Sequence, residues 1–187
     1  MAFVTEEVRL APSGKVYVAA VGSPEPVGVV DVMDPTWAEL GYITEDGVSL
    51  TPSVDTNDIR VWQSLQAIKT PITGVEFEVN FVPAQFNQDT LSLYFLGNQW
   101  ENSGGVARLE VSNSPGTQER SLCVEWEDDE GDLNRLVVPR AQITDREALN
   151  LQRSELLGLG VTFRALTGPD GYTAVLLSSN ADLIPAT

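Results

Sequence analysis

Apolar and polar residues alternate most regularly from Val75 to Phe81, where the sequence reads VEFEVNF. A period of two is typical of a β-strand with one face on a core and the other in water. The expected core face is Val75, Phe77, Val79 and Phe81, and the expected polar face is Glu76, Glu78 and Asn80. Two carboxylates on one exposed face would form a strip of negative charge.

The segment before this strand has a different pattern. Residues of about 44–63 mix Thr, Ser, Asp, Asn and Pro with isolated apolar residues that have no local core. This pattern predicts an extended loop that docks on another copy of the chain. The expected contact residues are Glu45, Asp46, Asp55, Asp58, Ile59, Arg60 and Trp62. Trp62 is the expected anchor, because a rigid aromatic residue near an arginine is typical of interface hot spots.

Further strands are predicted by short apolar or alternating runs that Gly, Pro and acidic turns separate. Their expected ranges are about 15–21, 66–82, 105–111, 119–127, 133–139, 157–166 and 172–178. A hairpin turn is expected at Asp46-Gly47, since this dipeptide favours tight turns between strands. A single helical turn is expected from Asp34 to Gly41, with Asp34 as its cap and Pro35 in its first position.

The best helix candidate runs from Asn87 to Gly97, with Asn87 as its cap and Gly97 at its end. Many short strands with one helix predict a mainly β fold, a β-sandwich or barrel with one flanking α-helix and a long inter-subunit loop. The length fits a single domain over residues 1–187, which includes an N-terminal arm of about residues 1–13.

The charge of the chain is strongly acidic, with 27 acidic and 11 basic residues and a net charge of −16. Scattered cations do not favour nucleic-acid or anionic-membrane binding, which needs clustered Lys and Arg. We expect neither a membrane span nor a secretory leader, because long apolar runs are absent from the sequence. Mutual repulsion should keep the subunit monomeric, and added salt should promote its polymerisation by screening.

The chain contains no histidine, which excludes Ser-His-Asp and Cys-His arrangements and imidazole zinc sites. Its single cysteine, Cys123, lies between Leu122 and Val124 and is expected to be a buried, inert thiol. We therefore predict no catalytic residues, no metal ligands and no cofactor.

The acidic run 125–132 does not have the spacing of a calcium loop. Counted from Asp128, the sixth position is Leu133 rather than glycine and the twelfth is Pro139 rather than glutamate. The run is expected to be a solvated hairpin turn, with a loosely held surface cation at 127–132 left open.

Two other functions remain open from the residues alone. Glu76 and Glu78 would lie roughly 7 Å apart along a strand, a spacing that some carboxylate hydrolases use. Trp100 and Trp126 could instead form the ligand platform of a carbohydrate-binding or adhesin β-sandwich.

Several segments together carry a family resemblance. They are GKVYVA at 14–19, GSPEP at 22–26, WAELGYITEDGV at 37–48, TNDIRVWQ at 56–63 and LVVPRA at 136–141. In this order they resemble the major tail protein, or tail tube protein, of long-tailed non-contractile bacteriophages, especially actinophages. The segments at 37–48 and 56–63 are the most specific.

The resemblance implies a structural virion protein of the tail, assembled in the host cytoplasm. Six copies would form a ring, stacked rings would form the tube, and the long loop and terminal arms would bridge rings. Glu76, Glu78 and Asn80 would face the lumen, through which DNA passes without specific binding. The implied partners are further copies of the chain, a tape measure protein, a tail terminator and a distal tail protein. Another structural tail protein, such as a terminator, is the alternative within this class.

Overall fold

The computed structural model describes residues 8–96, 100–111, 113, 118–154 and 156–185. Its strands are β1 (Ser13–Ala19), β2 (Ala38–Glu39), β3 (Ile43–Thr56), β4 (Ile59–Val61), β5 (Ser64–Lys69), β6 (Ile72–Pro83), β7 (Glu101–Ser103), β8 (Val106–Arg108), β9 (Glu119–Glu127), β10 (Leu133–Arg146), β11 (Val161–Ala165) and β12 (Val175–Ser178). The α-helix is α1 (Gln88–Phe95), and a short 3-10 turn, η2 (Ala181–Leu183), lies near the C-terminus. The prediction of a mainly β fold with one flanking α-helix is confirmed.

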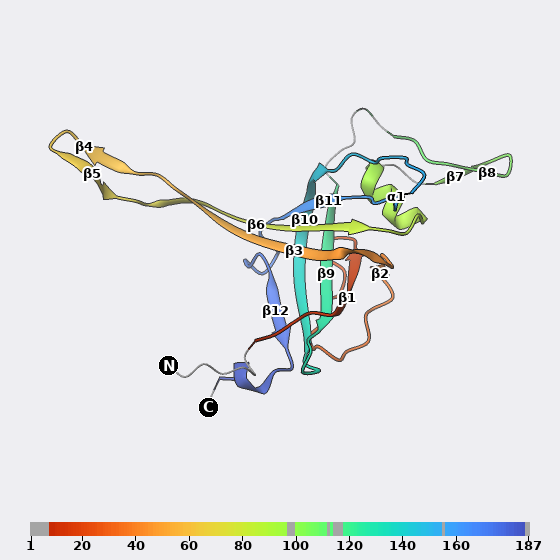
Figure 1. The fold of residues 1–187 in the computed structure, drawn as a ribbon, viewed down its shortest axis with the longest axis horizontal. Helices are drawn as coiled ribbons and strands as arrows, with labels where there is room; N and C mark the ends of the chain where they lie inside the picture. The colour runs from red at the N-terminus through yellow and green to blue at the C-terminus, as the bar shows by residue number, and fades with distance from the viewer. Residues whose placement is uncertain (1–7, 97–99, 112, 114–117, 155, 186–187) are drawn as a thin grey trace.

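One antiparallel sheet forms the body, with the strand order β2-β1-β9-β10-β11-β6-β3. The long strand β10 pairs with β12 through its first half and with β11 through its second half. The sheet twists so strongly that β3 and β6 cross β1, β9 and β10 (Figure 1). This crossing lets the two ends of a single sheet enclose one core, as in an orthogonal sandwich.

The core is built from one face of each body strand, and Phe81 of β6 stacks on Phe163 of β11 at its centre, with ring centroids 5.7 Å apart. The predicted alternation in β6 is confirmed for Val79 and Phe81, which are fully buried. The prediction is wrong for Val75, which is 73% exposed. Val75 has the right parity for the core face, but β6 has left the body at this point and has no core beneath it.

Helix α1 begins as predicted, at the N-cap Asn87. The Asn87 side chain accepts a hydrogen bond of 2.9 Å from the Thr90 backbone N–H, and the Thr90 hydroxyl accepts one of 3.1 Å from the Asn87 N–H. This reciprocal capping satisfies two backbone donors at the start of the helix. The helix ends at Leu96, which has a left-handed φ of 46°. The predicted end residue Gly97 lies outside the described residues, as do residues 1–7 of the predicted N-terminal arm.

The helical turn predicted from Asp34 is wrong, because the chain forms a β-turn there and continues into β2. The Trp37 N–H donates to the Asp34 carbonyl at 2.9 Å, while the Asp34 carboxylate accepts from the Thr36 N–H and hydroxyl. Trp37 is then held in the interior, where its indole N–H donates to the Pro24 carbonyl at 2.8 Å. This tertiary contact decides the path of the chain where the local signals allowed a helical turn.

The hairpin predicted at Asp46-Gly47 is also wrong, since β3 runs through this dipeptide as one strand. Gly47 does adopt the left-handed φ of 69° that favours glycine. However, pairing with β6 jumps from Ile43↔Pro83 to Val48↔Phe81, so residues 44–47 form a bulge rather than a turn. The apolar residues that follow the bulge then align with the core face of β6.

The acidic run does form a turn, as predicted, and it joins β9 to β10. The Asp128 carboxylate is buried, and it accepts hydrogen bonds from the backbone N–H groups of Glu130 and Asp132. The Asp128 carboxylate therefore satisfies backbone N–H groups of its own turn. Within the described part of the chain, acidic, cysteine and histidine side chains form no cluster suited to a metal ion.

Cys123 is fully buried as predicted, and burial raises the pKa of its thiol to about 12. A thiol with so high a pKa stays protonated at pH 8 and should not react with a disulfide reagent in the native protein. We expect one thiol per chain to become reactive only when urea unfolds the protein, measured by absorbance of the released chromophore. Rapid labelling without urea would contradict this prediction.

Candidate functional site: a polar sheet face and a projecting arm

The sheet face opposite the core is polar and uncovered where β3, β6, β11 and the second half of β10 lie side by side. Cross-strand pairing places these polar residues in register, because directly paired residues share a face. The polar face, as defined here, consists of Ser49, Thr51 and Ser53 on β3, Glu76, Glu78 and Asn80 on β6, Thr162 and Arg164 on β11, Gln142 and Asp145 on β10, and the neighbouring Glu119 and Arg140. None of these side chains is apolar.

The two predicted carboxylates are not a bare acidic strip, because Arg164 on the neighbouring strand pairs with both. Its two terminal nitrogens lie 3.3 Å from a Glu76 oxygen and 3.2 Å from a Glu78 oxygen. All three side chains are partly open to solvent. The third predicted residue, Asn80, donates to the Thr162 hydroxyl at 2.9 Å. The local charge of this cluster is therefore −1 rather than −2.

A second ion pair lies on the other side of the polar face. The Arg140 guanidinium donates two hydrogen bonds, of 2.8 and 2.7 Å, to the two carboxylate oxygens of Glu119. These bonds hold the pKa of Glu119 below its usual value and raise that of Arg140. The bidentate geometry fixes both side chains flat on the sheet. The two cations on this face are thus both engaged by carboxylates.

Sequence reasoning found the β6 residues of this face and missed those of the other strands. The segment Val161-Thr162-Phe163-Arg164-Ala165 alternates as regularly as the β6 segment. This alternation could have predicted that Thr162 and Arg164 share a polar face. It could not have shown that Arg164 lies against Glu78, since that pairing joins residues 86 positions apart.

The same side of the sheet is covered at its other end. The loop between β1 and β2 packs Trp37 against Tyr17, Cys123 and Val137. Arg135 ties this loop down through a hydrogen bond of 3.0 Å to the Asp31 carbonyl and through ion pairing with Glu125. The described residues leave open the part of this side made by β3, β6, β11 and the end of β10.

The second candidate surface is an arm, residues 53–75, that projects far from the body (Figure 1). The predicted extended loop at about 44–63 is wrong in form, because this segment is one side of a β-hairpin. The outer parts of β3 and β6 pair from Ser53↔Glu76 to Thr56↔Ile72, and β4 pairs with β5 at the tip. Asp58 joins the two sides of the tip, as its carboxylate accepts from Arg60 at 3.2 Å and from Thr70 at 3.0 Å.

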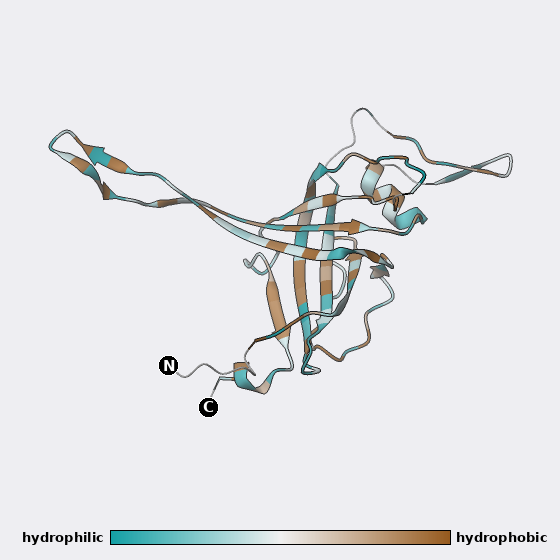
Figure 2. Ribbon diagram, in the orientation of Figure 1, coloured by the Kyte–Doolittle hydropathy of each residue, from teal (hydrophilic) through white to brown (hydrophobic). Residues whose placement is uncertain are grey.

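The prediction that the apolar residues of this segment lack a local core is confirmed for the arm but wrong for Val48, which packs against the main core opposite Phe81. Trp62 and Leu65 at the tip are 98% and 96% exposed. Apolar residues continue along the arm between polar ones (Figure 2). The other exposed apolar residues of the arm are Val54, Ile59, Val61, Ile68, Ile72 and Val75. Leu65 and Ile68 lie outside the predicted range of about 44–63, but they too are exposed apolar residues of the arm.

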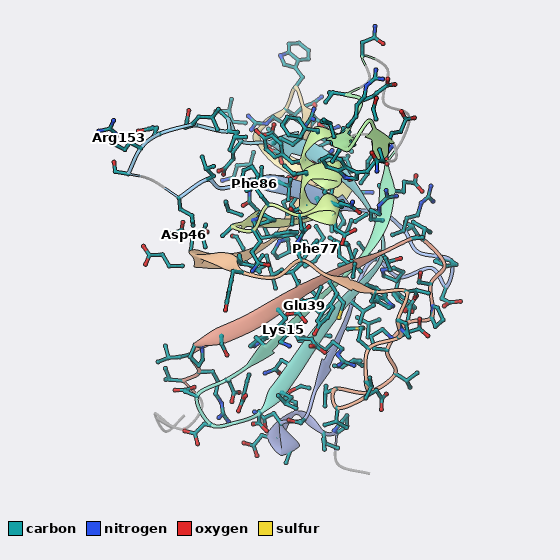
Figure 3. All side chains as sticks on the ribbon, turned by 90° about the vertical axis from the view of Figure 1, so that its right-hand side faces the viewer. Lys15, Glu39, Asp46, Phe77, Phe86 and Arg153 are labelled. Atoms are coloured by element: carbon teal, nitrogen blue, oxygen red, sulfur yellow. The ribbon has the colours of Figure 1, made fainter. Side chains whose placement is uncertain are left out.

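The seven predicted contact residues fall into two groups. Asp55, Asp58, Ile59, Arg60 and Trp62 lie on the arm, whereas Glu45 and Asp46 lie at the β3 bulge, next to the body. Figure 3 shows Asp46 at this bulge. Lys15 on β1 and Glu39 on β2 are labelled beside each other, away from Asp46. The structure therefore does not bring the two groups together within one chain.

The tryptophans considered for a sugar platform lie on different elements. The Trp100 indole N–H donates to the Gln88 carbonyl and the Ser92 hydroxyl of α1, at 3.1 and 3.0 Å. Trp126 lies on β9, where it packs against the core. Both have structural contacts that account for their positions.

None of the helices in the described residues is long and apolar enough to cross a membrane.

Comparison with known proteins gives the family of the chain. The family model for phage tail tube proteins matches residues 1–186. A chain in the 6-fold symmetrised cryo-EM structure of the anti-feeding prophage (AFP) baseplate is 11% identical, with a TM-score of 0.49, over 95% of this chain and 97% of that one. No curated protein matches the sequence. The family match spans almost the whole sequence, the body and the arm included, so the chain belongs to the phage tail tube protein family and is a structural component of a phage tail.

Proposed function

We propose that copies of this chain polymerise as stacked hexameric rings into a tail tube whose channel is lined by the polar face. One observation carries the proposal: four adjacent strands turn their apolar residues to one face and leave the other open, polar and free of apolar residues. A water-filled channel needs a polar wall of this kind.

The dimensions of such a ring suit duplex DNA. If each of six subunits contributes four strands, the wall contains about 24 strands at roughly 4.8 Å spacing. With a strand tilt of about 40°, the backbone diameter is roughly 48 Å. Side chains remove about 5 Å per wall, half the usual spacing of packed sheets. A closed ring also covers the free edge of β3 beyond its bulge, which would otherwise be a site of aggregation.

The charges of the polar face suit passage rather than binding. Proteins hold DNA through cations that replace the counterions of phosphates. Arg140 and Arg164 are both paired with glutamates, and the six charged residues of the face, Asp145 included, sum to −2. A wall of this kind offers phosphates no free cation.

The arm would join copies to one another. A two-stranded hairpin that stands alone is marginally stable in water, and this one exposes apolar residues along its length. Docking on a neighbouring copy would cover those residues. A tape measure protein inside the tube, and a tail terminator and a distal tail protein at its ends, complete the proposed assembly in the host cytoplasm.

Negative-stain electron microscopy of the concentrated protein tests the proposal. We expect hollow rods of uniform width, formed more readily at high salt because screening weakens the repulsion between subunits of charge −16. Protein that remains monodisperse at all concentrations and salt conditions, with or without a tail initiator complex, would contradict it.

Reversing the charge of Glu76 and Glu78 together should impair DNA delivery without preventing tube assembly. The double Glu76→Lys, Glu78→Lys variant leaves Arg164 unpaired and adds two further cations to the face. Phages that carry it should deliver DNA at roughly a tenth of wild-type efficiency or less, because several new phosphate contacts per ring retain the genome. Delivery is measured by potassium release and by DNA entry into host cells.

The matched control reverses two exposed acids away from the polar face, Glu101→Lys and Glu130→Lys. It makes the same change in net charge and should deliver DNA normally. Normal delivery by the Glu76, Glu78 variant would refute the assignment of these residues to the channel.

A further inference from the structure

A groove on the body lies between β1 and the beginning of β3, where the curled sheet does not close. Its volume is about 860 Å³, large enough to hold several side chains. The apolar part of its lining is Val16, Tyr42, Ile43, Val48, Leu50 and Trp126. Tyr42 is 76% exposed, so a wide aromatic surface at this groove has no cover within the described residues.

The polar part of the groove lining is mainly acidic. Glu39, Glu45 and Glu125 lie along it with a single cation, Lys15. Lys15 lies 3.5 Å from Glu39, and Glu125 pairs with Arg135. Lys15 and Glu39 are both labelled in Figure 3. Among the described residues Glu45 has no ion-pair partner. The groove is therefore an apolar surface with a net negative edge.

The bulge of β3 places backbone groups that do not pair with β6 beside the groove. Residues 44–47 are skipped in the pairing with β6, and the other side of β3 is the free edge of the main sheet. Free N–H and C=O groups on a sheet edge favour addition of an extended segment.

The tip of the arm has the complementary chemistry. The arm contains two acids, Asp55 and Asp58, and two bases, Arg60 and Lys69. It is thus neutral in a chain of charge −16, and its tip beyond Asn57 carries one more cation than anion. Lys69 makes no ion pair within the described part of the chain. Trp62 and Leu65 provide apolar side chains of a size that the groove can hold.

We propose that the groove between β1 and β3 receives the tip of the arm of a second copy. Trp62 and Leu65 enter the apolar part, and Lys69 lies against Glu45. The proposal rests on the self-assembly argued above and adds the receiving site. It also explains the two separate groups of predicted contact residues, because Glu45 and Asp46 belong to the receiving copy and the arm residues to the donating one.

Disulfide cross-linking tests this pairing, since the native cysteine is buried and should stay unreactive. The first test variant combines Lys69→Cys on the arm with Glu45→Cys at the groove, because the proposal sets these two residues side by side and a disulfide needs close Cα atoms. The second variant combines Leu65→Cys with Tyr42→Cys in the apolar part of the groove. The control combines Leu65→Cys with Val106→Cys, an exposed position on β8. Each is concentrated under tube-forming conditions, oxidised, and separated on a non-reducing gel.

We expect both groove variants to form a ladder of dimers and higher multiples that takes up most of the protein, and the control to form almost none. A ladder absent from both groove variants, or equally strong in the control, would overturn the groove as the receiving site. Electron microscopy of the same samples separates the two proposals. Tubes without the ladder would leave the tail tube proposal standing, whereas a ladder without tubes would support the groove and count against tube formation.

Discussion

Replacing Trp62 by alanine is expected to abolish tube formation while leaving the folded monomer as stable as the wild type. Trp62 is 98% exposed at the tip of an arm that makes no contribution to the core, so its removal costs the monomer nothing. An aromatic anchor buried at an interface contributes about 2–4 kcal/mol, or roughly 30- to 1,000-fold in the association constant. Because every copy in a tube repeats the contact, such a loss prevents polymerisation at ordinary concentrations.

The measurements are electron microscopy for tubes and thermal unfolding of the dilute protein for stability. The matched control is Leu151→Ala, another exposed apolar residue that lies outside the arm. It should polymerise like the wild type. Tubes of normal yield from the Trp62 variant would refute the role of the arm tip, and a lowered unfolding temperature would show that the tip supports the monomer.

Replacing Phe163 by alanine is expected to destabilise the monomer by about 3–5 kcal/mol, the range for large aromatic residues removed from packed cores. Phe163 is fully buried on β11 and stacks on Phe81 of β6 with an angle of 8° between the rings. The lost stacking adds to the cavity that the smaller side chain leaves. Since natural domains are stable by only about 5–15 kcal/mol, this loss removes a large part of the total.

Urea unfolding followed by tryptophan fluorescence measures the effect. The midpoint should fall while the slope of the free energy against urea stays the same. Phe86→Ala is the control, because Phe86 is 46% exposed and should cost far less. An equal fall for both variants would show that the β6–β11 contact is not the centre of the core.

The Phe163 and Trp62 variants test two different properties, the stability of one chain and the association of several chains. Phe163 acts inside one chain, where β6 and β11 meet, and its loss also disturbs the strands that carry Glu78 and Arg164. Trp62 is proposed to act only between chains. The contrast is a consequence of the fold, which packs one set of apolar residues inside the sheet and displays another along the arm.

The sequence by itself determined the features that depend on neighbours along the chain. The alternation of Phe77, Glu78, Val79 and Asn80 assigned each residue to a sheet face, because successive side chains of a strand point to opposite sides. Asn87 predicted the start of the helix, because its side chain bonds to backbone only three residues away. The exposed position of Trp62 followed from the lack of apolar company around it.

Only the tertiary structure decided the features that depend on residues far apart. It turned the predicted loop into a hairpin arm, because residues 53–56 find their partners at 72–76, beyond the tip. It carried β3 through Gly47 as a bulge, because the pairing of β3 with the distant strand β6 resumes at Val48↔Phe81. It also set Arg164 between Glu76 and Glu78. Local periodicity fixes which way a side chain points, whereas the register between distant strands fixes what that side chain meets.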